Sequence, residues 1–178
     1  SSLNGIEKAN NVELRYPQTT FWKKFRSLWR VWGITSDIEK ENIRLFHGLS
    51  NELPLNIRKA ENTRSIVTIH DLIFLRYPEY YHYIDRKIYA YKFRKACQNA
   101  DRIIAVSECT KRDIISFFHI PEEKIDVVYQ GCDAQFKQAV PENTKEEIRR
   151  KYQLPQRYIL YLGSIESRKN FQSQSDRI

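Results

Sequence analysis

The chain has 178 residues, of which 41% are hydrophobic and 13% aromatic, which excludes a disordered protein and allows one domain with part of a second. The formal net charge of +8 at pH 7 suits a polyanionic partner such as a nucleic acid, an anionic membrane surface or a phosphorylated substrate. No apolar run approaches the length that spans a membrane, so a transmembrane protein is not expected from these residues.

The cysteines and the acidic residues do not form a recognisable metal motif. Cys97, Cys109 and Cys132 have no C-x-x-C spacing and no histidine at ligand distance, and an odd number argues against a disulfide framework. Reduced thiols of this kind indicate a cytoplasmic protein. The chain also lacks an Asp-x-Asp pair, a P-loop and a complete dinucleotide fingerprint. We therefore predict no metal and no cofactor.

A basic, tryptophan-rich helix is predicted over residues 19–33, ending at Gly33. Five apolar side chains recur with helical spacing on one face: Phe21, Phe25, Leu28, Trp29 and Trp32. The other faces carry cations: Lys23, Lys24, Arg26 and Arg30. The helix either rests on an anionic bilayer or buries its aromatic face in the core, and the pattern leaves both open.

Short apolar runs predict buried strands at residues 44–46, 64–69, 103–106, 126–129 and 158–162. Helices are predicted between them at residues 85–100, 108–118 and 144–152, and residues 72–83 are expected to form a loop. Strands that alternate with helices and are apolar throughout are typical of a parallel sheet. We therefore predict an α/β fold, a Rossmann-like parallel sheet with helices on both faces.

Polar side chains follow two of these strands directly. His70 and Asp71 end the run at 64–69, and His47, Ser50 and Asn51 follow the strand at 44–46. In open α/β sheets, ligands bind just outside the carboxyl ends of the strands. The two histidines suggest one crevice with two imidazoles at its rim, although a purely structural role is the alternative for each of them.

Three further residues suit a phosphate. Ser107 is an N-cap candidate for the helix at 108–118, and a helix N-terminus binds phosphate well. Arg168 and Lys169 follow the last apolar run and Gly163, where two cations can neutralise a leaving phosphate. The alternatives are an N-cap without a ligand and an ordinary basic surface turn.

Five ordered blocks between Asn42 and Asn170 resemble the acceptor-side domain of family 4 glycosyltransferases, which are retaining enzymes of the GT-B type. The blocks are HGLSNELP, TIHDLIFLRYP, ADRIIAVSECTKRDI, EEKIDVVYQGCD and YLGSIESRKN. The resemblance implies metal-independent sugar transfer, with retention, from a nucleotide-diphosphate sugar to a glycan or lipid-linked acceptor, as in bacterial polysaccharide biosynthesis.

The same resemblance implies roles for the polar residues named above. His70, with Asp71 beside it, would lie near the donor sugar and the acceptor hydroxyl. Arg168 and Lys169 would contact the donor diphosphate. The His47 loop, together with Ser107 and Glu108, would line the cleft between two Rossmann-like domains.

The resemblance also implies a domain division. Residues 1–140 would be the acceptor-side domain without its first strand, glycine-rich turn and helix. Residues 141–178 would be a linker and the start of the donor-binding domain. Such a chain is expected to be inactive alone, in the cytoplasm or at the inner face of the membrane.

The alternative to a transferase is a basic, non-catalytic module that binds an anionic membrane surface or a nucleic acid. No RNA-binding signature with aromatic residues on paired strands is present, so nucleic acid is not an expected partner.

Overall fold

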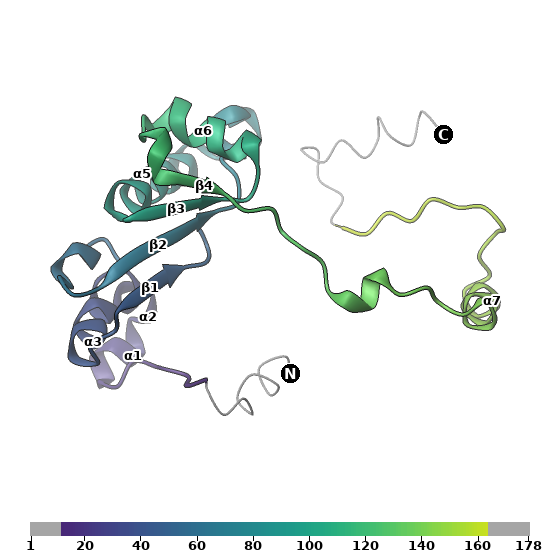
Figure 1. Cartoon of the computed structure of the whole chain (residues 1–178), viewed down its shortest axis with the longest axis horizontal. Coiled ribbons are helices and arrows are strands. Elements are labelled where there is room, and N and C mark those ends of the chain that lie inside the picture. Colours follow the sequence, from purple (N-terminus) through teal and green to yellow (C-terminus); the bar gives the residue numbers. More distant parts are fainter. Residues whose placement is uncertain (1–11, 164–178) are drawn as a thin grey trace. The chain divides into compact units, whose positions relative to one another are not determined.

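The computed structural model describes residues 12–163 of the chain (Figure 1). The chain divides into two compact units, Ser1–Tyr129 and Gln130–Ile178. The division at residue 140 inferred from the sequence lies within the second unit and stays a prediction.

The first unit is built on a four-stranded sheet. Its strands are β1 (Leu45–Gly48), β2 (Arg64–Ile69), β3 (Arg102–Ala105) and β4 (Ile125–Val127). They lie in the order β1-β2-β3-β4, and each neighbouring pair is parallel. The predicted parallel α/β fold is confirmed, and all four carboxyl ends meet at one edge of the sheet.

The segments between the strands are mostly helical. They are η2 (Ile57–Lys59), α4 (Ile73–Arg76), η3 (Pro78–Tyr80), α5 (Tyr83–Asn99), α6 (Glu108–Phe118) and η4 (Glu122–Lys124). Residues 72–83, predicted to be a loop, contain α4 and η3. The reason is that Phe74 is buried and packs edge-on against Phe93 of α5, which draws this segment onto the core.

The buried core lies on one face of the sheet. Val67 pairs with Ile103 and Ile69 pairs with Ala105 in register, and all four side chains are fully buried. They share a hydrophobic cluster with residues of α3 (Ile34–Lys40), α5 and α6. The alternate side chains of β2 and β3, including Ile66 and Ile104, are only half-buried. Right-handed crossovers between strands in sequential order place α5 and α6 on the same face, which accounts for this asymmetry. Helices on the other face, which the sequence also predicts, do not come from these crossovers.

The N-terminal helical segment differs from its prediction at Gly33. It runs through α1 (Thr20–Lys24), α2 (Arg26–Leu28), a π-helical turn (Trp29–Gly33) and α3, so Gly33 does not end it. A Cβ at Gly33 would lie 2.7 Å from Cδ1 of Trp29 and 2.9 Å from Cε2 of Trp22. The glycine is therefore a packing position inside the helical segment.

The five apolar residues of that segment do not share one environment. Trp29 is buried, and its indole N–H donates to Oδ2 of Asp37 over 2.9 Å. The other four are between 40% and 57% exposed: Phe21, Phe25, Leu28 and Trp32. The π-helical turn shifts the register, so the i, i+4 spacing of a regular α-helix does not hold across it.

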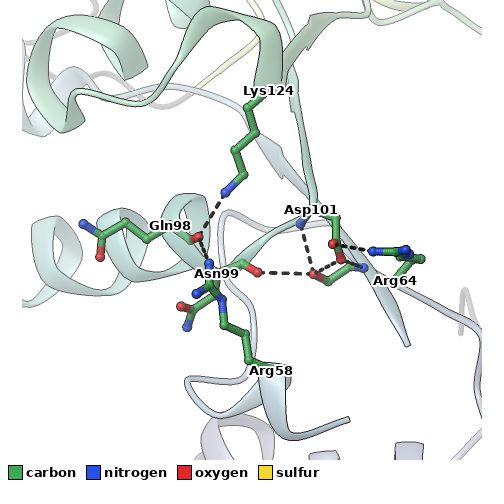
Figure 2. Close-up of polar contacts among 7 residues, drawn as sticks. Arg58, Arg64, Gln98, Asn99, Asp101 and Lys124 are labelled. Carbon is green, nitrogen blue, oxygen red and sulfur yellow. Dashed lines mark hydrogen bonds and ion pairs between the residues drawn. The ribbon is translucent and has the colours of Figure 1, made fainter. Parts of the chain in front are cut away.

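Polar contacts at the amino edge of the sheet tie the end of α5 to η2 and η4 (Figure 2). Nη2 of Arg58 donates to the Gln98 carbonyl over 2.7 Å, and Nζ of Lys124 donates to the same carbonyl over 3.0 Å. These cations satisfy carbonyls at the end of α5, as cations at helix C-termini do. Burial, with the Arg58 charge second, lowers the pKa of the Lys124 amine.

The second unit contains η5 (Ala134–Lys137) and α7 (Glu142–Lys151). α7 begins at Glu142, before the predicted start at residue 144, because Pro141 takes the N-cap position. Residues 158–162 do not form the predicted strand, and Ile159, Leu160 and Leu162 are largely exposed. A strand needs a neighbour for its backbone groups, and the described residues of this unit contain no other strand to pair with it.

Candidate functional site

The carboxyl edge of the sheet gathers most of the polar residues singled out in the sequence. His47 is the residue before the last in β1, His70 and Asp71 follow β2, and Ser107 and Glu108 follow β3. Because β1, β2 and β3 are neighbouring parallel strands, these positions adjoin one another. Glu108 and Asp71 are exposed, whereas His70 and Ser107 are half-buried.

His70 is held through its ring and through both of its backbone groups. Its Nε2 lies 2.9 Å from the Leu49 carbonyl, so Nε2 carries a proton in this geometry. Its backbone N–H donates to Oδ1 of Asn51 over 2.7 Å. Its carbonyl accepts from Oγ1 of Thr110 over 3.0 Å. The first two contacts come from the loop after β1 and the third comes from α6.

The loop after β1 folds back onto β2 through Asn51. The Asn51 backbone N–H donates to the Thr68 carbonyl over 3.1 Å, and its φ of 62° lies in the left-handed region that asparagine tolerates better than most residues. Gly48 makes this return feasible, since a Cβ there would lie 2.1 Å from the Glu52 carbonyl oxygen. From the sequence, Asn51 was expected to line the cleft with the rest of the His47 loop. In the structure its side chain holds the backbone N–H of His70.

His47 has a parallel role on β1. Its Nε2 lies 2.8 Å from Oγ1 of Thr68, so the ring ties β1 to the end of β2. His47 and Ser50 also line a pocket of about 190 Å³, which Arg30 of the N-terminal helical segment borders. The predicted pair of imidazoles is thus present at one edge, with each ring anchored to a neighbouring segment.

Ser107 is the N-cap of α6, as predicted. Its Oγ accepts from the backbone N–H of Thr110 over 3.1 Å and lies 3.0 Å from Oγ1 of Thr110. Asp71 makes a similar local contact, because its Oδ1 accepts from the backbone N–H of Ile73 over 3.2 Å at the start of α4. Both residues therefore fix the backbone that leaves a strand end.

An ion pair between α4 and α6 was not predicted from the sequence. Asp113 is buried, and its two carboxylate oxygens accept from Nε and Nη2 of Arg76. The hydrogen bond to Asp113 raises the pKa of the Arg76 guanidinium. Asp113 and Thr110 lie three residues apart on α6, so both contacts hold the segment that follows β2. No local spacing predicts a pair of residues this far apart in the chain.

Two predicted site residues cannot be placed. Arg168 and Lys169 lie outside the residues that the structure describes, so their contact with a diphosphate stays a prediction. Over residues 12–163 no group of three or more His, Cys, Asp or Glu side chains is placed to hold a metal ion. Over the same residues no helix is both long enough and apolar enough to cross a bilayer.

Comparison with known proteins gives consistent matches. The family model for Glycosyltransferase Family 4 matches residues 5–136. The O-antigen chain mannosyltransferase B of Escherichia coli is 32% identical over 130 residues, covering 71% of this chain and 32% of that protein. The serotype-specific mannosyltransferase WbdA of Escherichia coli is 30% identical over 138 residues, covering 74% of this chain and 16% of that protein.

A solved structure also aligns with the chain. It is a glycosyltransferase from Rickettsia africae ESF-5, with 21% identity and a TM-score of 0.49, and the match covers 86% of this chain and 38% of that one. The chain thus spans less than half the length of each of these three proteins.

Proposed function

Because the chain belongs to glycosyltransferase family 4, we propose that it supplies the acceptor-side part of a retaining sugar transferase. The donor is a nucleotide-diphosphate sugar and the acceptor is a glycan or a lipid-linked glycan. Both Escherichia coli relatives are named as mannosyltransferases, so a mannosyl donor is the first to test. The family match carries this proposal, and the constrained His70 at the carboxyl edge supports its location.

In this proposal the roles of the residues follow their positions. His70 and Asp71 border the place where the acceptor hydroxyl meets the donor sugar. His47, Ser50 and Asn51 line the acceptor side from the loop after β1, and Ser107 and Glu108 line it from the start of α6. Arg168 and Lys169 neutralise the leaving diphosphate, a task that cations and helix N-termini perform without a metal ion.

The transfer reaction is tested in two forms of the protein, the 178-residue chain and the longest open reading frame that contains it. Each is incubated with radiolabelled nucleotide-diphosphate mannose and a lipid-linked glycan acceptor, with and without a chelator. We expect transfer by the longer form, insensitive to the chelator, and none by the chain alone, because the chain spans less than half the length of the mannosyltransferases it matches. NMR of the product decides whether the anomeric configuration is retained. No transfer from any nucleotide sugar by the longer form would contradict the proposal.

A peripheral membrane contact is the second part of the proposal, and the N-terminal helical segment supports it. Phe21, Phe25, Leu28 and Trp32 are exposed there. Residues 19–36 contain no acidic residue, and they contain four cations: Lys23, Lys24, Arg26 and Arg30. Exposed aromatic side chains among cations suit the interface of an anionic bilayer. Arg30 also borders the pocket beside His47, so this surface adjoins the acceptor side of the site.

This contact would bring the protein to the inner face of the membrane and a lipid-linked acceptor to the site. A location in the cytoplasm is supported by the cysteines, because Cys97, Cys109 and Cys132 are all free thiols.

Vesicle co-sedimentation tests the membrane contact. We expect the chain to bind phosphatidylcholine vesicles that contain phosphatidylglycerol, and to bind pure phosphatidylcholine much more weakly. Binding should fall as salt rises, because exposed charges are screened. Phe21→Ser with Trp32→Ser should weaken binding at every salt concentration. The matched control is Phe136→Ser, which removes an exposed aromatic side chain from the second unit. Equal losses in both variants would contradict a contact through this segment.

A further inference from the structure

The two peptide groups that flank the Cα of His70 are each held by a side chain from another segment. Asn51 accepts from its N–H over 2.7 Å, and Thr110 donates to its carbonyl over 3.0 Å. These two hydrogen bonds determine the orientation of the backbone from which the imidazole extends. The ring is held separately, through Nε2 and the Leu49 carbonyl.

Thr110 delivers its contact through a closed set of hydrogen bonds at the start of α6. Its single hydroxyl proton goes to the His70 carbonyl, so the 3.0 Å contact with Ser107 requires the Ser107 hydroxyl to donate to Oγ1 of Thr110. The Ser107 oxygen in turn accepts from the Thr110 backbone N–H. Thr110 is 5% exposed, so water does not compete well for this hydroxyl. The hydrogen bonds that cap α6 are therefore connected, through Thr110, to the hydrogen bond that holds the His70 carbonyl.

The helix that carries Thr110 is itself anchored to the segment after His70. Asp113 lies one turn further along α6 and pairs with Arg76 of α4. Because α4 begins just after Asp71, α6 contacts the chain both at His70 and beyond it. The same helix face thus bounds the segment from His70 to Arg76 at two points.

We infer that Thr110 is a positioning residue for sugar transfer, acting through the His70 carbonyl to hold the imidazole in its working orientation. The inference rests on the proposed function, since it assigns His70 to the reaction. It also makes a structural claim that is independent of the reaction. The Thr110 hydroxyl keeps the neutral His70 ring in a single tautomer, protonated at Nε2. A small displacement of a reacting group lowers the reaction rate strongly, so loss of this hydroxyl should slow the reaction without preventing substrate binding.

Thr110→Val and Thr110→Ser separate the hydroxyl from the side-chain volume. In the transfer-competent form, Thr110→Val should lower kcat by about tenfold while KM for the donor changes by less than about twofold. Thr110→Ser keeps the hydroxyl and should restore most of kcat. The matched control is Thr63→Val, which removes a hydroxyl that donates to the Ile43 carbonyl over 2.7 Å, on the loop before β2 at the opposite edge of the sheet.

A second readout does not depend on catalysis. In the ¹⁵N-labelled chain, the wild type and Thr63→Val should show a His70 ring protonated at Nε2 in its neutral form and a slowly exchanging His70 amide. Thr110→Val should show a mixture of tautomers and a faster amide exchange. This arm decides the inference even if no form of the protein transfers sugar, so the two failures are distinguishable.

The inference is overturned by any of three results. One is a His70 ring and amide that are unchanged in Thr110→Val. Another is equal loss of kcat in Thr110→Val and Thr63→Val, which would indicate general destabilisation. The last is Thr110→Ser behaving like Thr110→Val, which would show that the methyl packing and not the hydroxyl matters.

Discussion

Gly48 is the residue whose identity decides whether the site can form. It is buried at the end of β1, where the chain turns back so that Asn51 reaches His70. A Cβ at this position would lie 2.1 Å from the Glu52 carbonyl oxygen and 3.0 Å from Cδ2 of Leu53. Backbone cannot yield as a side-chain tip does, so any larger residue must displace the loop.

We predict that Gly48→Ala destabilises the first unit by about 1–3 kcal/mol, the usual cost of inserting a methyl group into a packed position. Urea denaturation measures the change in the free energy of unfolding. Gly131→Ala is the matched control, because nothing lies within 4 Å of a Cβ there. If the two variants proved equally stable, the close approach at Gly48 would not constrain the loop.

At the scale of elements, β2 and β3 are joined at their amino ends by Asp101. Its Oδ2 accepts from the backbone N–H of Ser65 over 2.8 Å and from the Ser65 hydroxyl over 3.1 Å, and Arg64 donates to its Oδ1 (Figure 2). Burial raises the pKa of the Asp101 carboxyl, but the hydrogen bonds from Ser65 and Arg64 outweigh it. The pKa therefore lies below its ordinary value.

This lowered pKa predicts a particular dependence on pH. A carboxyl with a lowered folded-state pKa stabilises the fold above its unfolded pKa of about 4, and this stability is lost as the pH falls through the folded value. Asp101→Asn should therefore be less stable than the wild type at pH 7, and the difference should shrink below about pH 4. Urea midpoints across this range measure it. Glu79→Gln, which removes an exposed carboxylate, serves as the control. A constant difference across the range would contradict this account of Asp101.

The helices show where local sequence information is sufficient and where it is not. α6 begins after Ser107 and ends at Phe118, as the cap and spacing predict. Gly33 continues the helical segment because Trp22 and Trp29 of the same segment pack closely against it. Residues 73–76 form a helix because Phe74 is buried against Phe93 of α5. Residues 158–162 have the composition of a strand, but strand formation requires a partner that local composition cannot supply.

At the scale of the whole molecule, the parallel sheet explains how much of the site could be predicted. Once 64–69 is assigned as a buried strand, the carboxyl edge of the sheet follows from topology, and with it the positions of His70 and Asp71. The contacts of Thr110 with His70 and of Asp113 with Arg76 could not be predicted in this way. They join residues 40 and 37 positions apart, and only the packing of α6 on the sheet brings them together.

The central claim is that His70, at the carboxyl edge of β2, takes part in sugar transfer. The most direct test compares His70→Ala with wild type in the transfer-competent form, using His119→Asn as the control. His119 lies at the other end of α6 with φ 54°, a conformation that asparagine adopts readily. We predict that His70→Ala lowers kcat by about 100-fold or more with an intact fold, and that His119→Asn leaves it unchanged. A folded His70→Ala variant that transfers sugar at the wild-type rate would contradict the account.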